Sequence, residues 1–264
     1  MRTLQRIRPV LGVLALATLL GGCAGPPVAP PAENPASPAD SQVWLSADQR
    51  LYYYPPVEGE VLGYDGHNAA DGIFTIIVLN ATVLSVTVDD EGELVTVREQ
   101  GIYNVDIEGE TLNIPWDATH VFRTNLDGSL QLPASRLMAA ADTVSGDAWV
   151  VIPSVESMQA GPFRDSVAFT LGGDSAALDI ALDYTVTTLG RDDDFVDVQL
   201  QATGTSTLRG DAQGSPIDIT VVWEFQPGFG FHTERTTVSG DGISSDGTLT
   251  LSNYPLDIES LLDG

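Results

Sequence analysis

The stretch ALDIALDYTVTT, residues 177–188, alternates apolar and polar side chains. Every second position from Leu178 to Val186 holds leucine, isoleucine, tyrosine or valine, with aspartate, alanine or threonine between them. Successive side chains of a strand point to opposite faces, so the apolar set shares one face and the polar set the other. The pattern predicts a long strand with one buried face and one wet face, which antiparallel sheets allow.

The same alternation recurs along the chain on both sides of this stretch. The apolar runs are separated by connections rich in Gly, Asp and Pro, such as GRDDD (190–194) and RGDAQGSP (209–216). We also expect a bend at Gly101 between two of the strands. Connections this short join antiparallel neighbours. The clearest predicted strands are 74–88, 93–99, 102–108, 111–116, 177–188, 196–202 and 217–225.

Helical signals are few and short. ASRLMAAAD (134–142) follows Pro133 and predicts two turns of helix. LDIESLLDG (256–264) follows Pro255 and predicts another short helix. The predicted fold class is therefore all-β: an antiparallel barrel, half-barrel or sandwich of more than ten strands with few short helices. We favour a single β domain over 43–264, with two halves, 43–140 and 141–264, as the alternative.

The N-terminus has the composition of a secretory signal. Three arginines, Arg2, Arg6 and Arg8, precede an apolar run from Val10 to Leu20, and small residues follow. The run is shorter than the ~20 apolar residues that a membrane-spanning helix needs. We therefore expect residues 1–22 to be a cleaved signal peptide.

The run ends in LLGGC (19–23), which holds the single cysteine of the chain. This segment resembles the lipobox of bacterial lipoproteins. The resemblance implies cleavage before Cys23, diacylglycerol on its sulfur and a further acyl chain, such as palmitate, on its new N-terminus. An unmodified thiol is the alternative, and a disulfide within the chain is excluded. Two or more acyl chains anchor a protein stably to a membrane. By the same resemblance, Ala24 favours the outer membrane where the host has one, and otherwise the outer face of the cell membrane.

A proline- and alanine-rich segment separates Cys23 from the predicted strands. Residues 24–41 contain almost nothing that can pack into a core. Such a segment extends by ~3.1 Å per residue where it forms polyproline II, which makes a spacer of roughly 50 Å. We expect 23–42 to act as a lipidated linker that holds the β domain away from the membrane.

The chain is strongly acidic, with 11 Lys and Arg against 37 Asp and Glu and a formal net charge of −26. Removal of residues 1–22 takes away three arginines and no acids, so the balance becomes 8 minus 37, or −29. Nucleic-acid binding requires clustered Lys and Arg, and this chain has no lysine. The expected partners are therefore the membrane, through the anchor, and a hydrophobic ligand or an envelope protein, with nucleic acid excluded.

Three segments, LYYYPPVEGEVLGYDG (51–66), VREQGIYNVDIEG (97–109) and WEFQPGFGFHTER (223–235), resemble the TapB-type family of uncharacterised bacterial lipoproteins over residues 44–252. The resemblance implies an aromatic-proline segment that leads through a glycine loop into the first strand, and a late turn with proline and spaced glycines. Leu62 and Gly63 stand where the family has tryptophan. The resemblance implies no catalytic residues.

Catalytic motifs are scarce. The three histidines, His67, His120 and His232, have no metal-ligand spacing, and no G-x-S-x-G motif is present. Asp117 and His120 would meet across a turn, and His232 and Glu234 would share one face of a strand. For both pairs a structural role is the preferred interpretation. We therefore expect that the protein is not an enzyme and has no catalytic residue.

A metal site is also not expected. GDGISSDGT (240–248) and RDDD (191–194) have the oxygen ligands that calcium prefers, but neither fits an EF-hand loop, and Asp and Gly are common turn formers. We therefore expect no cofactor apart from the lipid on Cys23, and calcium is a minor alternative.

Aromatic residues are the remaining candidates for a binding site. They would line a ligand pocket or fill the β core, and the tyrosine triplet is the preferred pocket candidate because it precedes the strands. The set is Tyr52, Tyr53, Tyr54, Trp116, Trp149, Trp223, Phe229 and Phe231.

Together these features predict a lipid-anchored protein of the cell envelope. The leading hypothesis is a non-enzymatic module that binds an apolar ligand, a lipid or a protein. A purely structural or interaction lipoprotein is the first alternative. A hydrolase of envelope polymers, which would need His120 or His232 beside carboxylates in a cleft, is the second.

Overall fold

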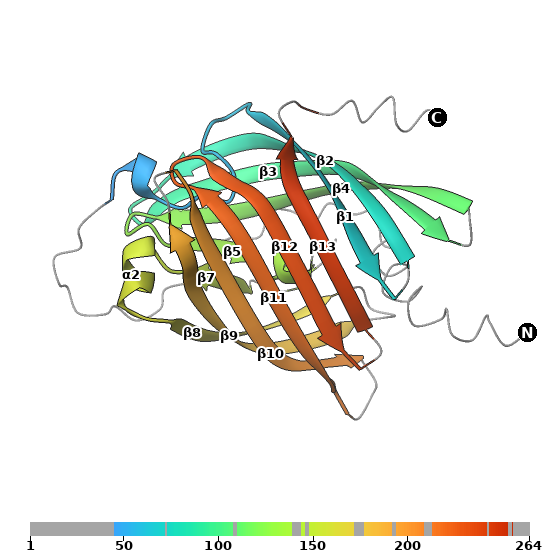
Figure 1. The fold of residues 1–264 in the computed structure, drawn as a ribbon. Coiled ribbons are helices and arrows are strands. Elements are labelled where there is room, and N and C mark those ends of the chain that lie inside the picture. The colour runs from blue at the N-terminus through green and yellow to red at the C-terminus, as the bar shows by residue number, and fades with distance from the viewer. Residues whose placement is uncertain are drawn as a thin grey trace, which may run out of the picture.

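The computed structural model describes residues 45–255 except 72, 108–109, 139–143, 146–147, 172–176, 192–193, 209–212, 242 and 253–254. Cys23, the linker and the predicted helix over 256–264 lie outside the described residues. The described chain forms one antiparallel sheet of 13 strands that curls into a nearly closed barrel (Figure 1).

The sheet order is β6-β8-β9-β10-β11-β12-β13-β1-β2-β3-β4-β5-β7. Consecutive strands are mostly neighbours, as short connections predict. The strands are β1 (Val61–Ala70), β2 (Ile73–Val88), β3 (Gly92–Ile107), β4 (Glu110–Asn125), β5 (Leu130–Pro133), β6 (Val144–Ser145), β7 (Trp149–Ile152), β8 (Phe163–Leu171), β9 (Leu178–Arg191), β10 (Val196–Leu208), β11 (Ser215–Gln226), β12 (Gly230–Gly240) and β13 (Ile243–Ser252).

The described helices are short: η1 (Ala47–Gln49) and η2 (Ala134–Met138) are 3-10 helices, and α2 (Val155–Ala160) is α-helical. Within the described part of the chain, none has the length and apolar character to cross a bilayer. The segment 134–142, predicted as two helical turns, forms the 3-10 helix η2 over its first five residues. The predicted fold class, all-β and antiparallel with more than ten strands and few helices, is confirmed.

The apolar faces of neighbouring strands form the core because their registers match. Leu200 of β10 pairs with Val186 of β9 on one side and with Val221 of β11 on the other, and all three are fully buried. The alternating stretch 177–188 lies almost entirely in β9 and turns its leucine, isoleucine and tyrosine side chains inward.

The predicted bend at Gly101 is wrong, because β3 runs without interruption through this residue. A Cβ atom there would lie 2.4 Å from the carbonyl oxygen of Val78 on β2. The glycine therefore permits two strands to approach closely inside one long ladder, and it does not end a strand.

The chain segment before β1 lies at one end of the barrel (Figure 1), and its residues Leu51–Tyr54 are buried. Thr124 Oγ1 donates a hydrogen bond of 2.9 Å to the carbonyl oxygen of Leu51. The backbone N–H groups of Gly228 and Phe231 donate to the carbonyls of Arg50 and Tyr53 at 2.9 and 3.3 Å. We call Leu51–Tyr54 the plug, and this end the plugged end.

The barrel closes at a seam between β7 and β8, and the polar groups there are bridged by a side chain. The Tyr184 hydroxyl of β9 accepts a hydrogen bond of 3.1 Å from the backbone N–H of Val151 on β7. It donates one of 3.3 Å to Asp165 Oδ2 on β8. The two edges of the sheet are thereby linked through one phenol.

Gly204→Ala is expected to destabilise the barrel by about 1 to 3 kcal/mol, because overpacking costs this much. The added Cβ atom of residue 204 in β10 would lie 1.9 Å from the carbonyl oxygen of Ala181 on β9. Urea unfolding gives the free-energy change. Gly190→Ala is the control, since the nearest atom to its Cβ would be 3.6 Å away. Equal stability of the two variants would contradict this packing.

Candidate functional site

A cluster of polar side chains lies in the barrel interior, where apolar residues otherwise dominate. Four distant parts of the chain supply it. The plug contributes Tyr53 and Tyr54, and β3, η2 and β12 contribute Glu99, Arg136 and Glu234. Each of these residues is at most 5% exposed. Burying a polar or charged group is costly unless it has a hydrogen-bond or ion-pair partner, so each of these side chains needs one.

The guanidinium of Arg136 is the centre of the cluster. Its Nη1 donates a hydrogen bond of 3.0 Å to Glu99 Oε2, and its Nη2 donates one of 2.9 Å to the Tyr53 hydroxyl. Tyr54 donates its hydroxyl hydrogen to Glu99, which therefore binds both a cation and a phenol.

Glu234 is held on the opposite side of Tyr53. The Tyr53 hydroxyl donates to Glu234 Oε2, and Trp223 Nε1 donates to the same oxygen at 2.7 Å. We call Tyr53, Tyr54, Glu99, Arg136, Trp223 and Glu234 the buried network. It connects the plug to η2 and to the barrel wall, so it fixes three parts of the chain at once.

The electrostatics keep the network's phenols protonated. Burial, together with the carboxylates of Glu99 and Glu234, raises the pKa of Tyr53 well above its usual value. Burial and Glu99 do the same to the pKa of Tyr54. Both hydroxyls therefore remain donors at neutral pH, and the formal charges in the network are two carboxylates against one guanidinium.

The predicted pair of Asp117 and His120 does not form. Both residues lie on β4, three positions apart, so their side chains point to opposite faces of the sheet. Asp117 is on the outer face and accepts a hydrogen bond of 2.9 Å from Arg98 Nε. His120 is largely buried, with Nε2 3.5 Å from Glu99 Oε2 and without a hydrogen-bond partner.

His232 and Glu234 do not form a pair either, because a β-bulge separates them. Glu224 pairs with Thr233 while Phe225 pairs with Phe231, so His232 is the extra residue of β12. Glu234 turns inward to the network, whereas the His232 ring contacts the rings of Phe195 and Phe229. The alternation that placed the two on one face is broken here.

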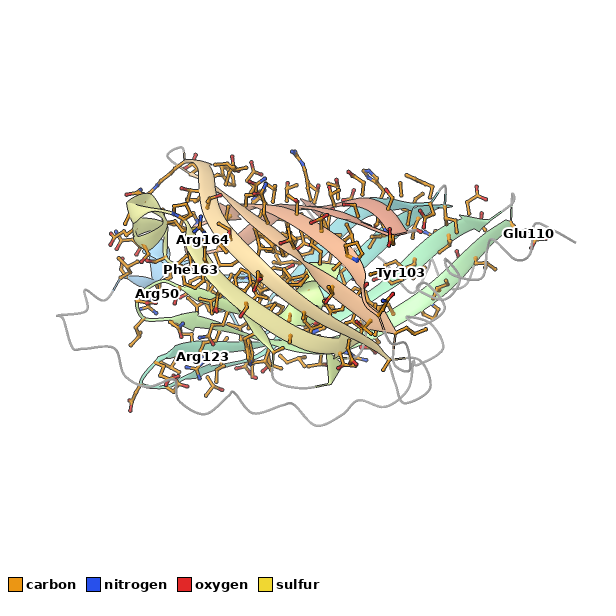
Figure 2. All side chains as sticks on the ribbon, turned by 90° about the horizontal axis from the view of Figure 1, so that it is seen from below. Arg50, Tyr103, Glu110, Arg123, Phe163 and Arg164 are labelled. Carbon is orange, nitrogen blue, oxygen red and sulfur yellow. The ribbon has the colours of Figure 1, made fainter. Side chains whose placement is uncertain are left out.

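A cleft of about 60 Å³ opens beside the network, on the side away from the plug. Arg136 and Glu234 form its buried end, and Tyr103, Trp116 and Ile77 are among its apolar walls. In Figure 2, Tyr103 lies toward the β3–β4 hairpin, which extends to Glu110, whereas Arg50 and Arg123 lie at the plugged end. We call the end with this cleft the open end.

Two buried polar atoms of the cleft residues have no hydrogen-bond partner. They are the indole nitrogen Nε1 of Trp116 and the hydroxyl Oγ1 of Thr236. Trp116 is 8% exposed and Thr236 is 5% exposed, and both line the cleft. An unsatisfied buried donor costs about 1 to 3 kcal/mol. Because both residues line the cleft, a ligand or water that reaches these two atoms would complete their hydrogen bonding.

A second hollow, of about 310 Å³, lies at the plugged end between η1, α2 and the β11–β12 turn. Asp48, Glu156, Asp194 and Arg191 are among the residues that line it. In the described part of the chain, no three His, Cys, Asp or Glu residues are grouped to hold a metal ion. The cleft is the stronger candidate because two of the residues that line it have buried polar atoms without a hydrogen-bond partner.

The aromatic residues proposed as pocket candidates are distributed over several environments. Trp116 lines the cleft, stacked against Tyr103 at 5.7 Å between ring centroids. Tyr53, Tyr54 and Trp223 belong to the buried network.

The other four pocket candidates lie away from the cleft walls. Tyr52 donates its hydroxyl hydrogen to Glu93 near the plugged end. Phe231 stacks on Tyr64 in the core at 4.7 Å. Phe229 is half-buried in the turn before β12, and Trp149 is half-buried on β7.

Sequence reasoning missed Glu99, Arg136 and Thr236. A signal existed for Glu99, which continues the inward register of Val95 and Val97 on β3 and so places an acid on an apolar face. For Arg136 the only hint was a lone cation in an alanine-rich segment. A charged residue in an apolar register indicates a buried partner, but it does not say which one.

The comparisons with known proteins concern the fold. No family model and no curated protein matches the chain. A candidate lipoprotein from Parabacteroides distasonis has a similar structure, with a TM-score of 0.52 and 12% identity over 76% of this chain and 97% of that chain. A candidate exported protein with a YmcC-like fold from Bacteroides fragilis has a TM-score of 0.45 and 16% identity over the same shares. The first similarity establishes a shared fold.

Glu99→Ala is expected to destabilise the protein by about 3 to 5 kcal/mol, because it leaves the buried guanidinium of Arg136 without its carboxylate. Glu99→Gln, which keeps the shape and loses the charge, is expected to cost less. Arg98→Ala is the neighbouring control. Its ion pair with Asp117 is about half exposed, with side-chain exposures of 45% and 49%, and exposed pairs contribute less than about 1 kcal/mol. Urea unfolding that ranks Arg98→Ala with Glu99→Ala would contradict this role.

His120→Asn is expected to make stability less dependent on pH. Burial lowers the pKa of His120 below its usual value, and Glu99 opposes this only in part. The unfolded chain, with a histidine pKa near ~6.5, then binds a proton that the folded protein excludes. Stability is therefore present above about pH 6.5 and decreases below it. Unfolding free energies between about pH 8 and pH 5 should fall less steeply in the variant; parallel curves would count against this assignment.

Proposed function

We propose that this protein is an exported lipoprotein of the cell envelope, anchored through Cys23, whose barrel is a non-enzymatic binding module. The signal peptide, the lipobox and the proline-rich linker support the anchor. The similar fold of a candidate lipoprotein from Parabacteroides distasonis is in keeping with it. The observation that carries the binding role is the cleft with two unsatisfied buried polar atoms.

The size of the cleft restricts what the module binds. One water needs about 10 to 15 Å³ of such space, so 60 Å³ holds roughly four to six waters. Sites that enclose a drug-sized ligand measure about 300 to 1,000 Å³. A complete acyl chain does not fit in this cleft. The sequence suggested an apolar ligand, a lipid or a protein. Each of these would insert only one end or one side chain into the cleft.

The arrangement of the network supports a non-enzymatic role. Glu99 and Glu234 are each occupied by two or more hydrogen bonds from tyrosine, tryptophan or arginine. Such bonds hold the carboxylates in place and keep the network rigid. A general base instead needs reach to a substrate proton.

One observation favours the hydrolase alternative, namely the approach of His120 Nε2 to Glu99 Oε2 at 3.5 Å. A working acid or base must also reach a substrate. The cleft is lined by residues from β1, β2, β3, β4, η2, β12 and β13, and His120 is not one of them. The binding role therefore accounts for more of the geometry.

Membrane fractionation of cells that express the full chain tests the anchor. The wild type is expected in the membrane fraction and Cys23→Ala in the soluble fraction, since two or more acyl chains are needed for stable attachment. Mass spectrometry of the mature N-terminus is expected to find an acylated Cys23. Membrane association of Cys23→Ala, or a wild type without acyl mass, would overturn the proposal.

A further inference from the structure

We infer that the cleft at the open end is a saccharide-binding site that takes the edge of one neutral sugar ring. This inference rests on the binding role proposed above and names the class of ligand. It is carried by three features of the cleft: its aromatic wall, its unsatisfied polar atoms and its balance of charge.

The aromatic wall is formed by Tyr103 and Trp116. Their rings stack with centroids 5.7 Å apart and an interplanar angle of 28°, and both residues line the cleft. Aromatic faces carry negative charge density and attract positively polarised edges. The C–H groups on one face of a sugar ring provide such an edge.

The polar side chains of the residues that line the cleft favour a ligand that both donates and accepts hydrogen bonds. Trp116 Nε1 is a donor only, while Thr236 Oγ1 can donate and accept, and neither has a partner. Arg136 uses three of its N–H groups on Glu99 and Tyr53, which leaves two of its five. Both hydrogen bonds that Glu234 accepts in the network end on Oε2. Vicinal hydroxyl groups match this mixture, because each is donor and acceptor.

The balance of charge favours a neutral ligand. The formally charged side chains that line the cleft are one carboxylate, Glu234, and one guanidinium, Arg136, so their formal charges cancel. The whole chain carries a formal charge of −26, which disfavours an anion. A cation would leave the indole N–H of Trp116 without an acceptor and would approach Arg136. A neutral polyol avoids both costs.

The volume limits how much of the sugar is enclosed. A space for roughly four to six waters holds two or three hydroxyl groups and the adjoining ring edge, and the remainder lies in the open mouth. Few buried ligand atoms give weak binding, so the dissociation constant is expected on the order of millimolar. A glycan end is therefore the natural form of the ligand.

The test uses the indole N–H signals of ¹⁵N-labelled protein in NMR titrations. The chain has 4 tryptophans, and Trp116→Phe identifies the signal of Trp116. The probes are methyl glycosides of glucose, galactose, mannose and N-acetylglucosamine, with acetate and tetramethylammonium as charged probes. At least one glycoside is expected to shift the Trp116 signal saturably, and the charged probes are not.

Variants locate the binding by ligand-observed NMR. Thr236→Val, which keeps the side-chain shape, and Trp116→Phe are expected to weaken glycoside binding at least tenfold. Trp149→Phe is the matched control, because Trp149 lies on β7 and does not line the cleft. It is expected to leave the affinity unchanged.

Three results would overturn the inference. Glycoside binding that persists in both Thr236→Val and Trp116→Phe would place the glycoside site outside the cleft. A shift with acetate or tetramethylammonium alone would assign the cleft to a charged ligand, which removes the saccharide but leaves the binding role. No shift with any probe would remove the saccharide and leave the binding role to a lipid end or a protein side chain. None of these results bears on the lipid anchor, which fractionation tests separately.

Discussion

The interaction on which the rest of the structure depends is the buried ion pair between Arg136 and Glu99. A charge inside a protein is stable only when its partners are in place, and here the partners come from distant segments. The guanidinium binds Glu99 of β3 and Tyr53 of the plug, and Tyr53 in turn binds Glu234 of β12. The plug, η2 and two parts of the barrel wall therefore have one mutually consistent position.

The same pair explains why the two ends of the barrel differ. On the plugged side, aromatic rings pack against the network; Tyr53 stacks on Phe122 at 4.7 Å and contacts Phe231 at 4.6 Å. On the other side Arg136 and Glu234 line the cleft, together with Trp116 and Thr236, whose buried polar atoms have no hydrogen-bond partner. One polar cluster thus separates a solid core from a small site.

The fold could be predicted from the sequence because alternation along a strand is local. The stretch 177–188 gives both the strand and its buried face without knowledge of its neighbours. The prediction of a bend at Gly101 was wrong for the opposite reason, because only the approach of β2 to β3 shows that this glycine allows close packing. The network could not be predicted, since alternation places Glu99 inside but does not reveal that Arg136 lies opposite.

The bulge in β12 shows the same limit at the scale of single residues. Period-two reasoning put His232 and Glu234 on one face, and a single extra residue sent them to different environments. The position of such a bulge depends on how β11 and β12 pair, which no local pattern specifies.

The seam at Tyr184 makes one line of the barrel wall different from the others. In a closed barrel, strand number and stagger fix the diameter, because every strand is bonded to two others. Here the sheet order ends at β6 and β7, and a phenol links the edges, through Val151 and Asp165. Along this line the described wall is therefore joined by the side chain of one tyrosine and not by a ladder of backbone hydrogen bonds, so a single substitution at Tyr184 would remove the link.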